Sequence, residues 1–69
     1  IDKDAELARL EKLMGQREDQ IKRSQAKLAN KSFVDRAPAE VVEKERNQLA
    51  EHEAALTELT TQFEKINAL

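Results

Sequence analysis

Residues 30–38 have the sequence NKSFVDRAP and separate two long stretches of heptad-patterned sequence. Asn30 suits the end of a helix, since asparagine tolerates the left-handed conformation that terminates many helices. Pro38 suits the start of the next helix. N–H groups in the first helical turn have no partner within the helix, so proline loses no hydrogen bond there by lacking an N–H. We therefore expect a helix over about residues 2–30, a turn over about 31–37 and a second helix over about 38–68.

Both stretches repeat apolar residues every seven positions. In the first stretch these residues are Leu7, Met14, Ile21 and Leu28, with Leu10 in a second column. In the second stretch they are Val42, Leu49, Leu56 and Phe63, with Leu59 and Ile66 beside them. A seven-residue period is typical of coiled-coil packing, and a short connection favours antiparallel neighbours. The predicted fold is therefore all-α, an antiparallel two-helix coiled-coil hairpin.

The register and the weak part of this hairpin can also be predicted. A turn centred near Phe33 places Leu10 near Leu56, Leu7 near Leu59 and Ser24 near Val42. This register is predicted to within one helical turn. The core columns in the middle of the hairpin are polar at Arg17, Ser24, Glu45 and His52. Gly15 adds a cost of about 1 kcal/mol relative to alanine in a helix. We expect a hairpin of marginal stability.

Composition excludes several kinds of site. The chain has 69 residues, of which 38% are charged and 3% aromatic, which is typical of long exposed helices. It has no cysteine, so a disulfide or a thiolate zinc site is excluded. Its apolar runs are too short for a bilayer span or a signal peptide, and we expect no membrane partner. The chain begins at Ile1 and not at Met, which indicates a piece of a longer protein.

Side chains suited to catalysis are scarce. There is one histidine and no Gly-rich loop, so His-rich metal sites and phosphate-cradling loops are unsupported. A general acid or base needs a pocket to shift its pKa, and a two-helix rod offers none. We expect His52 to be a packed or half-exposed side chain and not a ligand or a pH switch. The prediction is that this chain contains no catalytic residue, no metal ligand and no bound cofactor.

Charge is distributed unevenly along the chain, although its net charge is only −2. Residues 20–46 hold seven cationic and four anionic side chains, a net charge of +3, whereas the remaining residues hold five and ten, a net charge of −5. One flank of the first helix has no acidic residue. It consists of Arg9, Leu13, Gln16, Gln20, Arg23, Lys27 and Asn30. The matching flank of the second helix contributes Val41, Lys44 and Gln48 near the turn. Cations and amides are the donors that bind phosphate and sugar oxygens.

Two interpretations of this surface stay open at this point. One is a binding surface for RNA or another polyanion. The other is a plain solvated face or a contact for a protein partner. Phe33 and Val34 at the turn leave a similar choice, since they either close the open end of the hairpin or form an apolar tip on which a base could stack.

The turn and its flanks resemble a known family. Residues 27–49, KLANKSFVDRAPAEVVEKERNQL, are similar to the C-terminal arm of bacterial valyl-tRNA synthetases, chiefly through KLAN at 27–30, Phe33-Val34, Ala37-Pro38 and VVEKER at 41–46. The opening IDKDAELARL and the closing heptads are similar too, so that the resemblance covers essentially the whole chain. The sequence departs from the usual pattern at residues 14–17, MGQR.

The resemblance implies an arm that follows an anticodon-binding domain and holds the outer corner of tRNA, where the D-loop and T-loop meet. The longer protein would be a cytoplasmic class I synthetase that joins valine to tRNA(Val) using ATP. This chain has neither the HIGH-type nor the KMSKS-type signature of the ATP site. We therefore expect as partners tRNA(Val) and the remainder of the synthetase, and no DNA. The candidate RNA-binding residues are Arg23, Lys27, Asn30, Lys31, Phe33, Arg36, Lys44 and Arg46.

Overall fold

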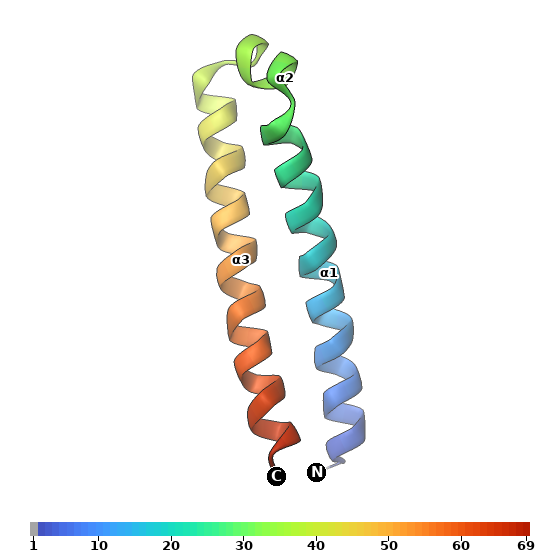
Figure 1. Cartoon of the computed structure of the whole chain (residues 1–69). Coiled ribbons are helices and arrows are strands. Elements are labelled where there is room, and N and C mark those ends of the chain that lie inside the picture. Colours follow the sequence, from blue (N-terminus) through green and yellow to red (C-terminus); the bar gives the residue numbers. More distant parts are fainter. Residues whose placement is uncertain (1) are drawn as a thin grey trace.

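The structure is a computed structural model that describes residues 2–69, so Ile1, where the family resemblance begins, lies outside the described residues. Three helices follow one another, α1 (Lys3–Ala29), α2 (Lys31–Arg36) and α3 (Ala39–Asn67). Figure 1 shows α1 and α3 running antiparallel side by side, with α2 across the end that is far from both termini. The molecule is a rod of 50 × 14 × 13 Å. The predicted all-α hairpin is confirmed.

The connection contains a helix of its own, α2, where the sequence led us to expect a turn over residues 31–37. Asn30 joins α1 to α2 in an extended conformation, with φ −80° and ψ 106°, so the predicted left-handed ending of the first helix is wrong. The Asn30 side chain instead accepts a hydrogen bond from the backbone N–H of Ser32 at 3.0 Å. Asparagine is among the best N-cap residues, and a second helix that starts directly after the first needs such a cap.

A second extended break lies between α2 and α3. Ala37 has φ −72° and ψ 147°, which is the conformation that a following proline favours. The Pro38 carbonyl then accepts hydrogen bonds from the N–H groups of Val41 and Val42 at 3.0 and 3.2 Å. Helix α3 thus begins directly after Pro38, and Glu40 places a carboxylate in its first turn, where the helix dipole favours negative charge.

The core between α1 and α3 is thin. Among residues 2–69, only Leu10, Val42 and Ser24 are buried, and Leu10 alone is fully buried. Each helix of a two-helix hairpin has one neighbour, so most heptad side chains are only half-buried. Burying a leucine contributes about 1.5–3 kcal/mol, and few side chains here gain the whole amount. Within residues 2–69, none of the helices combines the length and the hydrophobicity that a membrane span requires.

The register differs from the predicted one by about one helical turn. Arg17 lies against His52, with Nη1 and Nδ1 2.8 Å apart. The predicted pairing of Leu10 with Leu56 would have placed Arg17 near Leu49 instead. The ion pair between Lys27 and Glu45 and the hydrogen bond from Lys3 Nζ to the Leu69 carbonyl are displaced from the predicted pairing in the same direction. The cause is α2, because the helix in the connection moves the midpoint of the hairpin beyond Phe33 toward Pro38.

Candidate nucleic-acid interface

The far end of the rod carries the cationic side chains that the sequence singled out. We call this end the basic tip and define it by Arg23, Lys27, Lys31, Arg36, Lys44 and Arg46, all of which are exposed. Lys31 and Arg36 belong to α2, which crosses the end of the hairpin (Figure 1). The basic tip therefore lies at the end of the rod far from both termini, and the residues outside 20–46, which we call the acidic stem, carry a net charge of −5.

The six cations of the basic tip do not share one face. Arg23 and Lys27 are four residues apart on α1, so they lie on the same face of that helix. Lys44 and Arg46 are two residues apart on α3, and about 200° of rotation places them on opposite sides of it. Arg46 also lies 3.8 Å from the Glu43 carboxylate. The structure thus brings Arg23 and Lys27 together and points Lys44 and Arg46 apart.

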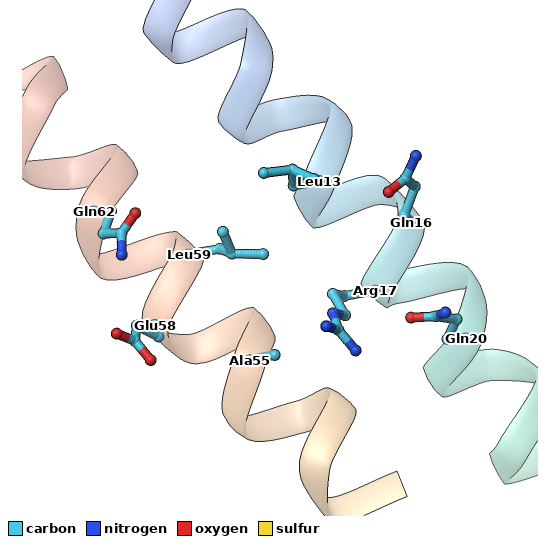
Figure 2. A pocket seen from close by; sticks show the side chains of 8 residues that line it. All are labelled: Leu13, Gln16, Arg17, Gln20, Ala55, Glu58, Leu59 and Gln62. Atoms are coloured by element: carbon cyan, nitrogen blue, oxygen red, sulfur yellow. The ribbon is translucent and has the colours of Figure 1, made fainter. Parts of the chain in front are cut away.

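A groove runs along the stem between the two long helices, with a volume of about 350 Å³. Figure 2 shows Leu13 of α1 and Leu59 of α3 pointing toward one another across the space between the helices. The groove is lined by Leu13, Gln16, Arg17, Gln20, Ala55, Glu58, Leu59 and Gln62. The acid-free flank of α1 therefore lies beside the matching flank of α3, as antiparallel packing predicts.

The groove and the basic tip share one flank of the rod. Gln16 and Gln20 precede Arg23 and Lys27 by seven residues each, and Glu58 follows Lys44 by fourteen, so each pair occupies the same heptad position. The flank that holds amides in the stem thus continues into Arg23, Lys27 and Lys44 at the tip. Arg46 lies on the other flank.

Lys27 has a partner in the core. Its Nζ lies 3.9 Å from a carboxylate oxygen of Glu45. The Glu45 side chain is only 13% exposed, whereas that of Lys27 is 60% exposed. Part of the Lys27 charge therefore offsets a half-buried carboxylate on α3, and the rest of the ammonium group faces solvent.

The two uncharged candidates have different surroundings. Asn30 is exposed, but its side-chain oxygen is already bonded to the Ser32 N–H and caps α2. Phe33 and Val34 are both half-buried, so each is neither a closed core residue nor a fully exposed apolar tip. Part of the Phe33 ring stays accessible at the end of the rod.

From the sequence, Arg17 and His52 were predicted only as polar residues in the core columns. In the structure both side chains are half-buried, and they are joined by a 2.8 Å hydrogen bond. Arg17 also lines the groove. A signal was present in the sequence, since Arg17 occupies a core column directly between the flank residues Gln16 and Gln20. The sequence alone does not show that the Arg17 side chain reaches His52 or that a groove forms beside it.

Electrostatic effects elsewhere on the rod are small. Arg9 donates a hydrogen bond to Glu6 at 2.9 Å. This bond and the positive charge of Arg9 lower the pKa of Glu6 below its ordinary value. Both side chains are exposed and belong to the stem, far from the basic tip. Residues 2–69 contain no cluster of three His, Cys, Asp or Glu side chains that could hold a metal ion.

Comparison with known proteins assigns the family. A family model described as the valyl tRNA synthetase tRNA binding arm matches residues 2–67. A valine–tRNA ligase from Rhodopirellula baltica is 64% identical over 50 residues, which is 72% of this chain and 5% of that protein. No solved structure matches the chain. The chain spans a small part of its curated relative, but the family match covers nearly all of the chain itself, and the chain therefore belongs to the tRNA-binding arm family of valyl-tRNA synthetases.

Proposed function

We propose that this chain is the tRNA-binding arm of a cytoplasmic valine–tRNA ligase and that it holds the outer corner of tRNA(Val) through the basic tip. The ligase chemistry, including the use of ATP, belongs to a catalytic domain outside this chain. The observation that carries the proposal is the position of the cations, because α2 presents Lys31 and Arg36 at the same end of the rod at which α1 carries Arg23 and Lys27.

The charge pattern gives the proposed contact its mechanism. The corner of tRNA is a shape built from paired loops, so an arm that reaches it recognises backbone and shape more than sequence. Exposed lysine and arginine side chains bind phosphates and release counterions, which makes affinity fall steeply with salt. The acidic stem repels phosphate along most of the rod and favours contact at the tip.

The geometry of Lys27 decides which substitution tests this proposal. A change of Lys27 to glutamate would place two carboxylates near one another at Glu45 and disturb the fold as well as the charge. The double variant Arg23→Gln and Lys27→Gln removes both cations and keeps side chains of similar length. Lys12→Gln with Lys65→Gln is the matched control, since both lysines are exposed on the stem.

The measurement is the dissociation constant of the synthetase for tRNA(Val) over a range of salt concentrations. Loss of two phosphate contacts lowers the salt slope by about 1.4–1.8 and weakens binding about tenfold or more. The stem control keeps its affinity. If the tip variant binds tRNA as tightly as the unchanged protein, the arm serves instead as a structural or protein–protein coiled coil.

A further inference from the structure

Arg17 is a half-buried cation without an acidic partner. No Asp or Glu oxygen in the described part of the chain lies within 4.0 Å of its guanidinium. Its one hydrogen bond to residues 2–69 goes to the neutral acceptor Nδ1 of His52. A guanidinium has five N–H donors, so most of them remain available. A guanidinium that lines a groove with free donors and no acidic partner can bind an anion through charge-assisted hydrogen bonds.

The surroundings of Arg17 suit a phosphate group. Gln16, Gln20 and Gln62 supply amide donors along the edges of the groove, and Leu13 and Leu59 form an apolar wall. The groove also includes one acid, Glu58. In Figure 2 the Glu58 carboxylate lies on the side of α3 that faces away from α1, whereas Arg17 extends into the space between the helices. The cation is therefore closer to the space between the helices than the acid is.

We propose that the groove around Arg17 is a second RNA contact, which binds a backbone phosphate of the tRNA through the guanidinium and the adjacent glutamine amides. This inference rests on the proposed function and extends it from the basic tip into the stem. Arg17 lies in the core column beside the flank that carries Arg23 and Lys27, so its positive charge adds to theirs toward a polyanion. Arg17 is twelve residues from the end of α1, about 18 Å along the helix, so tip and groove contact different phosphates.

His52 acts in this site as a positioning residue. A guanidinium can only donate, so the contact holds Nδ1 as an acceptor and directs the Arg17 side chain across the space between the helices. The remaining N–H donors then face the groove. Fixing the guanidinium before binding removes part of the entropy cost that a free arginine pays when it meets a phosphate.

The test is Arg17→Met in the synthetase, with binding to a tRNA(Val) transcript measured over a range of salt concentrations. Methionine keeps an unbranched side chain of comparable reach and removes the charge. We expect affinity to fall about three- to tenfold and the salt slope to decrease by about 0.7–0.9, the value for one phosphate contact. The melting temperature of the hairpin is expected to stay the same or rise, since an apolar side chain suits a core column.

Lys12→Met is the matched control, because Lys12 is an exposed cation on the same helix and does not line the groove. We expect it to leave affinity and slope unchanged. Unchanged tRNA binding in Arg17→Met would overturn the groove site, and so would an equal loss in Lys12→Met, which would indicate a general effect of charge. The tip variant Arg23→Gln/Lys27→Gln separates the two proposals: if it weakens binding and Arg17→Met does not, only the groove site is wrong, and if neither weakens binding, the proposed function fails as well.

Discussion

Arg17 and His52 form the only hydrogen bond between side chains of α1 and α3 in the described residues, with 2.8 Å between Nη1 and Nδ1. The bond lies in the middle of the rod, in a layer where a coiled coil usually places apolar residues. A polar pair at such a position fixes which residues face one another and lowers stability in exchange. The pair therefore helps to set the register of this hairpin.

The first prediction concerns this pair. Replacing both residues, Arg17→Leu with His52→Leu, should stabilise the hairpin by about 1–4 kcal/mol, because well-packed apolar residues avoid the cost of desolvating the charge. Each single change should gain less, since it leaves one polar partner without the other. Urea unfolding of the four proteins, followed by circular dichroism, measures the coupling. Two single effects that add up to the double within about 0.5 kcal/mol would mean that the pair is not coupled.

Gly15 offers a second prediction. It lies inside α1, and an added Cβ atom there would meet no atom within 4 Å. Gly15→Ala should therefore stabilise the hairpin by about 1 kcal/mol, because alanine restricts the unfolded chain and costs nothing in the helix. The expected rise in melting temperature is about 4–8 °C. Ala8→Gly, at an exposed residue in the same heptad position one repeat earlier, should lower the melting temperature by a similar amount. A drop after Gly15→Ala would show that the position needs the space that glycine leaves.

The third prediction follows from the ion pair in the stem. The hydrogen bond from Arg9, together with its charge, lowers the pKa of Glu6. A lowered pKa in the folded state means that the pair stabilises the hairpin at neutral pH, and that this contribution is lost as the pH falls through the titration of Glu6. Because both side chains are exposed, the effect on stability is small and the NMR titration of the Glu6 carboxyl carbon is the sensitive measurement. Arg9→Gln should raise the pKa of Glu6 toward its ordinary value, whereas Lys12→Gln should not change it. Equal effects of the two changes would assign the shift to general charge and not to the hydrogen bond.

The heptad columns were sufficient to predict the hairpin, because a seven-residue period persists over the length of both long helices and few other folds produce it. The connection was harder to predict. Helix α2 has six residues, fewer than two turns, so no periodicity can appear in it. Asn30 is compatible both with a left-handed helix end and with an N-cap, and only the helix that follows it decides between them.

The exact register of the two long helices and the groove between them could not be predicted from the sequence. A shift of one turn keeps every apolar column facing its partner, so hydrophobic pattern alone does not distinguish the two registers. The sequence predicted that Arg23, Lys27 and Lys44 share one flank, because antiparallel packing brings matching flanks together, but it did not separate Arg46 from them. Arg17 meets its partner 35 residues away, a contact that no local pattern indicates.

The last prediction separates two roles for Asn30, which the sequence suggested as an RNA contact and the structure shows as the cap of α2. Asn30→Ala removes the acceptor of the Ser32 N–H and should cost about 1 kcal/mol, with α2 losing order first. Because α2 presents Lys31 and Arg36, its loss should also weaken binding to tRNA. Asn30→Ser keeps a capping oxygen but removes the amide. If Asn30 acts only as a cap, the serine variant should retain both the amide-exchange protection of α2, measured by NMR, and the affinity of the synthetase for tRNA(Val). A serine variant that keeps the protection of α2 but loses affinity would assign a direct RNA contact to the amide of Asn30.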